Sequence, residues 1–317
     1  MTRTDRQHET RAEFLLLIVV LIWSSNYPLA KWALAGMNVF VFNAIRFVVS
    51  AGVVGVVFFS RSKWQPITTG DWSKLLQVGI VANVIYQGVF VIGLSMTSAG
   101  NSAILLSTAP LWTLLIGARM HKDRISPMLW MGMIVSLSGV AMIVIGSGKK
   151  LEFGDASVFG DLITLVAAML WGLNTNLQKP ILTRYSVLQM TLIMMCIGAA
   201  GLTGLAIVPA MSFDWMGISP WYYVAAITSG ALSIAIANVM WSYGVKRLGP
   251  GRTSNFSYLV PVLALMFSFA FLGESIHAIQ VIGMSVTIVG VWIARRFSQP
   301  KLEAIAAKNA IDEAVGA

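Results

Sequence analysis

Aromatic and amide side chains lie close together inside otherwise apolar stretches of this sequence. Trp23 and Asn26 are three residues apart, and Trp171 and Asn174 repeat that spacing. Residues three or four apart share one face of a helix, so each pair presents a ring beside an amide. Because an amide that faces lipid is costly, such a face points at protein or at a water-filled cavity. Bonding between helices is the alternative to lining a cavity.

Polar side chains of this kind define a set of candidate binding residues. The set consists of Trp23, Asn26, Tyr27, Arg46, Asn83, Tyr86, Gln87, Trp171, Asn174 and Gln178. Arg46 is the only basic residue placed well inside an apolar stretch. A guanidinium matches a carboxylate through two parallel hydrogen bonds, so Arg46 is a candidate anchor for that group. Its long stem could equally carry the charge out to the outer headgroups.

The sequence offers little support for catalysis or for a metal site. An intramembrane enzyme needs a buried nucleophile with its base, paired carboxylates or metal ligands, and no apolar stretch has a central His, Asp or Glu. Glu274 and His277 are three residues apart, but a helix cap or an interface role suits this pair better than a metal. We expect no catalytic residue, no metal and no cofactor.

The composition indicates which elements must carry these residues. Of 317 residues, 57% are apolar and 11% are charged, whereas a soluble domain is about half apolar and a quarter charged. The net charge of +9 comes from basic residues in short clusters between apolar runs, a pattern typical of membrane orientation and not of nucleic-acid binding. We therefore expect an all-α integral membrane protein in a lipid bilayer. The sequence does not determine its oligomeric state and is compatible with a monomer.

The apolar runs predict ten transmembrane helices, since a spanning helix needs roughly 20 apolar residues. We place them at 13–33, 39–60, 72–94, 100–118, 127–146, 157–179, 187–209, 220–243, 251–272 and 277–295. The stretch from Leu75 to Ala118 contains no charged residue. As one helix it would be about 66 Å long, twice the roughly 30 Å core of a bilayer. It must therefore turn back, and we expect the turn between Thr97 and Gly100.

The distribution of basic residues predicts the orientation. With the N-terminus inside, eighteen Lys and Arg residues lie in cytoplasmic segments and only Lys31, Lys149 and Lys150 lie outside. Cytoplasmic loops of membrane proteins carry this excess of positive charge. We expect a multi-pass protein of the plasma (cell inner) membrane with both termini in the cytoplasm.

An internal repeat divides the chain. A shift of 148 places Trp23 on Trp171 and Asn26 on Asn174, and a shift of 151 places Pro110 on Pro261. Each copy carries five helices, and because five is odd the second copy enters the membrane inverted. The segments are a cytoplasmic N-terminus (1–12), a first five-helix repeat (13–146), an external linker (147–156), a second five-helix repeat (157–296) and a cytoplasmic tail (297–317).

Five plus five helices, a Trp in the first helix of each half and the step Leu272-Gly273-Glu274 before the last helix carry a family resemblance. In these features the chain resembles the drug/metabolite transporter superfamily and, within it, the EamA family, over roughly residues 13–296. The resemblance implies ten helices, a central cavity and movement of amino acids or other metabolites, usually outward. The small multidrug resistance branch uses a carboxylate in the middle of its first helix, whereas Glu13 lies at the cytoplasmic end here.

We therefore expect a secondary transporter that exports amino acids, aromatic or other apolar ones among them, or related small metabolites by alternating access. The alternatives are an intramembrane enzyme, a receptor or scaffold, and a drug or cation efflux protein. An outer gate is expected at Asn26, Tyr27, Tyr86, Gln87, Ser102 and Ser107. An inner gate is expected at Asn174, Gln178, Asn238, Trp241, Asn255 and Tyr258, with static packing as the alternative for these positions.

The orientation can be tested with a reporter that is active only outside the cell. Fusion after Arg124 should leave the reporter silent, and fusion after Lys150 should activate it, because the basic residues place these two positions on opposite sides. The reverse pattern of activity would contradict the orientation.

Overall fold

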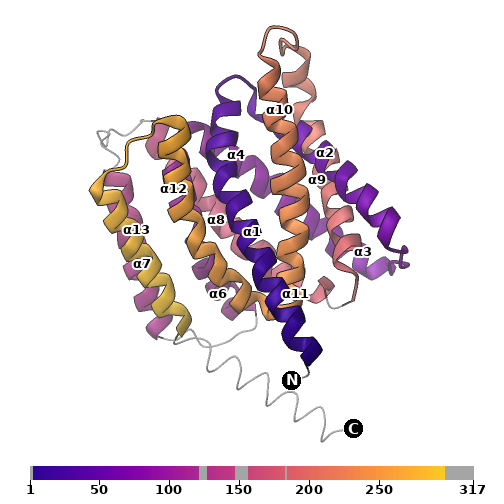
Figure 1. Cartoon of the computed structure of the whole chain (residues 1–317), viewed down its shortest axis with the longest axis horizontal. Helices are drawn as coiled ribbons and strands as arrows, with labels where there is room; N and C mark the ends of the chain where they lie inside the picture. The colour runs from indigo at the N-terminus through magenta and orange to yellow at the C-terminus, as the bar shows by residue number, and fades with distance from the viewer. Residues whose placement is uncertain (1–2, 121–126, 147–155, 183, 297–317) are drawn as a thin grey trace, which may run out of the picture.

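The computed structural model describes residues 3–120, 127–146, 156–182 and 184–296, and all regular structure in these ranges is helical. The first half contains α1 (Arg3–Leu34), α2 (Val39–Arg61), α3 (Thr69–Gly79), the π-helix η1 (Ile80–Ile85), α4 (Tyr86–Met96), α5 (Ala99–Leu106), α6 (Ala109–Met120) and α7 (Pro127–Gly146). The second half contains α8 (Ala156–Leu182), α9 (Val187–Met211), α10 (Pro220–Thr228), the π-helix η2 (Ser229–Ile236), α11 (Ala237–Asn255), the 3₁₀-helix η3 (Phe256–Tyr258), α12 (Leu259–Leu272) and α13 (Ala278–Arg296). The helices lie side by side in one bundle (Figure 1).

Seven helical segments in the described ranges are long and apolar enough to cross a membrane. They are Glu9–Leu34, Val39–Arg61, Thr69–Met96, Ala99–Met120, Ala156–Leu182, Val187–Met211 and Pro220–Leu248. Three shorter apolar helices, Trp130–Ile143, Leu259–Leu272 and Ala278–Ile293, lie where the other spans were expected. The described part of the chain is thus all-helical, and its apolar helices are those of a multi-span membrane protein. The count of ten spans and their inverted arrangement stay predictions at this point.

The turn expected after the third span is confirmed, because α4 ends at Met96 and α5 begins at Ala99. The carboxylate of Glu274 accepts hydrogen bonds from the backbone N–H groups of Ala99 at 2.9 Å and Gly100 at 3.1 Å. A carboxylate at this position satisfies free amides and complements the positive end of the helix. Gly273, with φ of 66°, makes the turn that brings Glu274 there. The interpretation of Glu274 as a helix cap is therefore confirmed.

Several expected helices are interrupted where the sequence shows no break. The third expected span consists of α3, η1 and α4, and the eighth consists of α10, η2 and α11. A π-helix is a wider turn that occurs often at functional sites. The expected helix at 100–118 is broken between Leu106 and Ala109, which separates α5 from α6.

One expected helix boundary is wrong. A break was expected between 243 and 251, whereas α11 continues to Asn255. The first helix runs through Pro28 and ends at Leu34, close to the expected end at residue 33. A proline in a membrane helix removes one backbone hydrogen bond, and neighbouring groups replace it. Hydropathy shows where apolar composition ends, and a helix need not end there.

Glycines hold α7 and α13 together at one edge of the bundle (Figure 1). A Cβ atom added at Gly139 would lie 2.5 Å from the carbonyl oxygen of Gly283. One added at Gly290 would lie 2.3 Å from the backbone nitrogen of Ser136 and 2.7 Å from the carbonyl oxygen of Gly132. Small residues let membrane helices approach this closely, so the pair depends on the missing side chains.

Gly290→Ala should therefore push α13 away from α7 and cost about 1–3 kcal/mol of stability. The measurement is the apparent unfolding temperature of the purified protein in detergent. Gly204→Ala on α9 is the matched control, because no atom lies within 4 Å of the added Cβ there. Equal unfolding temperatures for the two variants would contradict the packing argument.

Candidate binding cavity

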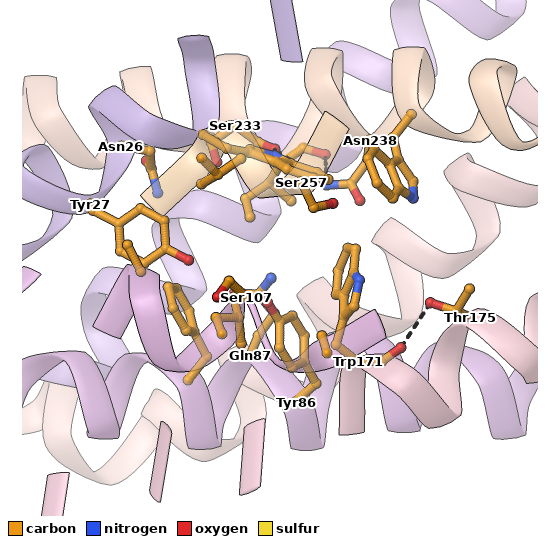
Figure 2. A pocket seen from close by; sticks show the side chains of 18 of the residues that line it. Asn26, Tyr27, Tyr86, Gln87, Ser107, Trp171, Thr175, Ser233, Asn238 and Ser257 are labelled. Atoms are coloured by element: carbon orange, nitrogen blue, oxygen red, sulfur yellow. Dashed lines mark hydrogen bonds between the residues drawn. The ribbon is translucent and has the colours of Figure 1, made fainter. Parts of the chain in front are cut away.

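A cavity lies between two groups of helices, and the centre of a water molecule could occupy about 90 Å³ of it. Wall 1 consists of α1, η2 with α11, and η3 with α12, and wall 2 consists of α4, α5 with α6, and α8. Figure 2 shows Asn26 and Asn238 of wall 1 across the cavity from Gln87 and Trp171 of wall 2. The volume is several times the roughly 10–15 Å³ that one water needs, so a small organic molecule is the expected occupant.

Side-chain hydrogen bonds hold wall 1 together. The hydroxyl of Ser24 on α1 donates to the carbonyl oxygen of Val260 on α12 at 3.1 Å. The hydroxyl of Ser229 on η2 donates to Oδ1 of Asn26 on α1. These bonds satisfy polar groups that would otherwise face an apolar surrounding, and they tie α1 to each of the other two elements of wall 1.

Wall 2 is held in the same manner, with glycines added. Nδ2 of Asn176 on α8 donates to the carbonyl oxygen of Thr113 on α6 at 3.0 Å. A Cβ atom at Gly172 would lie 2.7 Å from the backbone nitrogen of Thr113, and one at Gly160 would lie 2.9 Å from the backbone of Met96 on α4. Wall 2 is thus packed backbone against backbone.

Three tryptophans meet where the two walls face each other. The ring of Trp23 lies edge-on to that of Trp171, with centroids 5.7 Å apart, and Trp241 lies 5.0 Å from Trp23 and 6.4 Å from Trp171. Nε1 of Trp23 donates to the carbonyl oxygen of Ser233 in η2 at 3.1 Å. Tyr86 lies 5.1 Å from Trp171 and extends the aromatic surface along wall 2. The contact between Trp23 and Trp171 therefore joins wall 1 to wall 2.

A smaller cavity of about 30 Å³ adjoins the first. Five residues line both cavities and so form their common boundary, namely Gln87, Trp171, Thr175, Asn238 and Trp241. Asn83 lines the smaller one, and its amide donates to a backbone carbonyl of α9 at 2.8 Å. Nε2 of Gln178 donates to Oδ1 of Asn174 at 2.7 Å in the same place. The amides of the smaller cavity are thus largely engaged with protein groups.

Arg46 on α2 reaches the larger cavity and is 1% exposed. Its Nη1 donates to Oδ1 of Asn43 at 2.9 Å, and Nδ2 of Asn43 donates to the carbonyl oxygen of Gln87 at 2.9 Å. The guanidinium also lies over the ring of Phe42, 5.0 Å from its centroid. Gly230 lets η2 pack against the backbone of Arg46, because a Cβ atom added at Gly230 would lie 2.5 Å from the carbonyl oxygen of Arg46. This burial is incompatible with the interpretation that Arg46 extends to the headgroups.

The structure divides the candidate binding residues between the two cavities. The larger cavity is lined by Trp23, Asn26, Tyr27, Arg46, Tyr86, Gln87 and Trp171. The smaller cavity is lined by Asn83, Asn174 and Gln178, and it shares Gln87 and Trp171 with the larger one. That these side chains bind a substrate stays a prediction.

Residues of both expected gates lie close together in the described structure, and their role as gates stays a prediction. The larger cavity is lined by Ser107, Asn238 and Trp241 as well as by Tyr86 and Gln87, so members of both expected gates meet there. Ser102 lines neither cavity, and its buried hydroxyl has no hydrogen-bond partner in the described part of the chain. The side chains of Asn255 and Tyr258 lie outside the described residues.

Several lining residues were missed by the sequence interpretation. They include Phe90, Thr113, Thr175, Ser233 and Ser257. Thr175 directly follows Asn174, so the position of Asn174 in the sequence could have indicated that Thr175 lines the cavity. Ser233 lies in η2, and the wider turn there was not visible in the apolar pattern.

The lining determines which chemistry the cavities can support. Neither cavity is lined by Asp, Glu or His. Among the described residues, no group of three or more His, Cys, Asp or Glu side chains could hold a metal ion. What the cavities present is a set of aromatic rings, amides, hydroxyls and one guanidinium, which suits reversible binding of a small molecule.

Known proteins similar to this chain are transporters by name. An uncharacterized transporter of Archaeoglobus fulgidus is 25% identical over 285 residues, covering 90% of this chain and 97% of that protein. A probable terminal-alkyne amino-acid exporter of Streptantibioticus cattleyicolor is 26% identical over 287 residues, covering 90% and 94%. A crystal structure with 18% identity has a TM-score of 0.64, covers 90% of this chain and 98% of that one, and shows a likeness of fold.

The family comparison covers nearly the whole chain in two pieces. The sequence model of the EamA-like transporter family matches residues 10–145 and again residues 158–296. These two matches contain every residue that lines the two cavities. The chain is therefore a membrane transporter and belongs to the EamA-like transporter family.

Proposed function

We propose that this chain is a secondary transporter that exports amino acids or related small metabolites by alternating access through the larger cavity. The observation that carries the proposal is the cavity itself, because each of its two walls combines helices from both halves of the chain. A site between two such walls opens to either side when they rock against each other. The name of the relative from Streptantibioticus cattleyicolor supports amino acids as the class.

The arrangement of the walls supports ten spans in two inverted repeats. The shift of 148 relates α1 of wall 1 to α8 of wall 2. The shift of 151 relates η2, which ends at Ile236, to η1, which ends at Ile85, and relates Pro261 of α12 to Pro110 of α6. The repeat therefore exchanges wall 1 with wall 2. The excess of basic residues in the expected cytoplasmic segments supports an orientation with both termini on the cytoplasmic side of the plasma membrane.

Polar and aromatic contacts join the two walls at one end of the cavity. Lys31 of α1 donates to the carbonyl oxygens of Leu94 at 3.0 Å and Ser95 at 2.9 Å, both on α4. Tyr27 and Phe90 lie edge to face with centroids 5.8 Å apart. These contacts close the end of the cavity that the proposed orientation places outside. Opening to the outside would break them while each wall keeps its internal hydrogen bonds and glycine contacts.

Export of cations as the main function is less well supported. Carriers that exchange protons for cations use a carboxylate inside the membrane. Neither cavity is lined by an acidic residue, and Arg46 adds positive charge to the larger one.

Counterflow in proteoliposomes tests the transport proposal. Vesicles preloaded with an unlabelled amino acid or metabolite should accumulate its labelled form only when they contain the protein. Trp171→Ala should lower the initial rate by at least about tenfold, because losing one aromatic surface of the cavity costs more than about 1.4 kcal/mol. If no compound in a panel of amino acids and small carboxylates, assayed at two pH values, exceeds protein-free vesicles, the proposal fails.

A cross-link between the walls should stop transport. Single cysteines at Lys31 and Ser95, in a Cys196→Ala background, place one thiol on each wall near their contact. A short thiol cross-linker should abolish counterflow, and a cleavable version should restore it after reduction, because the walls could no longer separate.

The matched control is a cross-link inside wall 1. Leu16 of α1 touches Gly244 of α11, where a Cβ would lie 2.9 Å from Leu16, and Leu16→Cys makes room for Gly244→Cys. This cross-link should leave counterflow nearly unchanged. Movement of the walls against each other would be contradicted if both cross-links reduced counterflow equally. It would also be contradicted if the cross-link between Lys31 and Ser95 left counterflow unchanged.

A further inference from the structure

The charge of Arg46 has no opposite charge in the described structure. The ion pairs found among the described side chains both involve Asp71, with Lys74 and with Arg184. Arg46 is 1% exposed, and no acidic side chain lines the cavity it reaches. A buried charge without a counter-charge is costly, and in membrane proteins such a residue marks a binding or transport pathway. The cavity is therefore incomplete without an anion.

The hydrogen bonds around Arg46 leave room for that anion. Of the five N–H donors of the guanidinium, Nη1 is engaged by Asn43, while the buried Nε has no hydrogen-bond partner. Asn43 is itself held by the carbonyl oxygen of Gln87, and the ring of Phe42 supports the guanidinium plane. The guanidinium is thus fixed by neutral groups, and its full charge remains available to a ligand.

A carboxylate is the ligand group that fits best. Its two oxygens accept parallel hydrogen bonds from a guanidinium, which inorganic chloride cannot do. The rest of the cavity offers the rings of Trp23, Tyr86, Trp171 and Trp241, which suit an apolar or aromatic body attached to the carboxylate.

The ammonium group of an amino acid finds no charged partner. The cavity offers only neutral acceptors, such as Oε1 of Gln87, which has no hydrogen-bond partner in the described structure. A monocarboxylate neutralises Arg46, whereas a zwitterion leaves the occupied cavity with the same net positive charge as the empty one. The electrostatic balance therefore favours the carboxylate that lacks the ammonium group.

We propose that the cavity binds small apolar or aromatic monocarboxylates through Arg46 and that an α-ammonium group is dispensable. The proposal rests on the proposed transport function and narrows its substrate class. It places deaminated or N-acylated relatives of amino acids in the same site as amino acids, and it excludes the corresponding amines.

Three probes that share a phenyl ring and differ in their charged groups test the roles of the carboxylate and the ammonium group. Phenylalanine carries both charged groups, 3-phenylpropanoate lacks the ammonium, and 2-phenylethylamine lacks the carboxylate. Equilibrium binding of the labelled probes to the full chain in nanodiscs should rank 3-phenylpropanoate at least equal to phenylalanine, with no measurable binding of 2-phenylethylamine. The assay is run in sulfate and in chloride buffer. Amine binding that depends on chloride would show that an inorganic ion serves Arg46, and this would overturn the proposal.

Two variants test the role of the guanidinium. Arg46→Gln should weaken the binding of 3-phenylpropanoate by about 10- to 100-fold, which is the range expected for the loss of hydrogen bonds to a charged group. Asn43→Asp keeps nearly the same volume and places a carboxylate 2.9 Å from Nη1 of Arg46, while the hydrogen bond to the carbonyl oxygen of Gln87 is lost. Asn43→Asp should weaken the binding of 3-phenylpropanoate by a similar factor, because the protein then supplies the anion itself. This variant also tests the proposal if Arg46→Gln does not fold.

Ser50→Ala is the matched control on the same helix. Ser50 is buried on α2, about one turn beyond Arg46, and lines neither cavity. This variant should bind the probes as the unchanged protein does. Full carboxylate binding in Asn43→Asp, or equal binding of 2-phenylethylamine and 3-phenylpropanoate, would overturn the proposal.

Binding and flux together separate this proposal from the transport proposal. Arg46-dependent binding without counterflow of any probe would retain the carboxylate site and reject the transport function for these substrates. Counterflow of 2-phenylethylamine that is unaffected by Arg46→Gln would retain transport and reject the carboxylate site. Absence of binding by all three probes would reject the substrate class.

Discussion

A bilayer core offers no water to polar groups, and this constraint explains most of the structure. Each buried amide on a membrane helix must find a partner on another helix or face a cavity. Asn43, Asn83 and Asn176 each donate to a backbone carbonyl of a neighbouring helix, and Asn26 accepts from the hydroxyl of Ser229. The polar side chains thereby specify which helices pack together. The guanidinium of Arg46 has more N–H donors than the described protein groups engage, and it lines the larger cavity, where a ligand can accept from them.

The same constraint separates rigid contacts from those that can change. Inside each wall, side chains bond to backbone carbonyls and glycines bring backbones into contact, as at Gly160 and Gly172. Between the walls the contacts include ring pairs such as Trp23 with Trp171 and Tyr27 with Phe90. A ring pair contributes about 0.5–1.5 kcal/mol beyond the area it buries, and rings can repack in a new orientation. Lys31 and Glu274 also bond to backbone groups at the ends of α4 and α5 across this boundary, so opening that end must replace these partners. The backbone contacts at Gly160 and Gly172 lie within wall 2 and need not separate.

The sequence predicted the general fold and part of the cavity because both follow from the cost of polar groups in lipid. The turn before Ala99 was recognised from the length of an uncharged stretch, and the aromatic and amide pair Trp171 and Asn174 from the cost of an amide that faces lipid. The π-helices and the break after Leu106 were not, because they depend on how neighbouring helices pack and leave no mark in an apolar run. The burial of Arg46 was left open for the same reason. Only the position of α2 beside η2 decides whether its charge reaches the headgroups or the cavity.

Movement of the walls against each other is the central claim, and a distance measured across them tests it most directly. Phe159 of α8 and Phe271 of α12 are exposed, and each lies near the end of the bundle where Glu274 caps α5. Spin labels at these two positions, measured by double electron–electron resonance in nanodiscs, should show two distance populations. Their ratio should shift when a transported substrate is added. A single distance that is unchanged by substrate, in protein that still transports, would contradict the account.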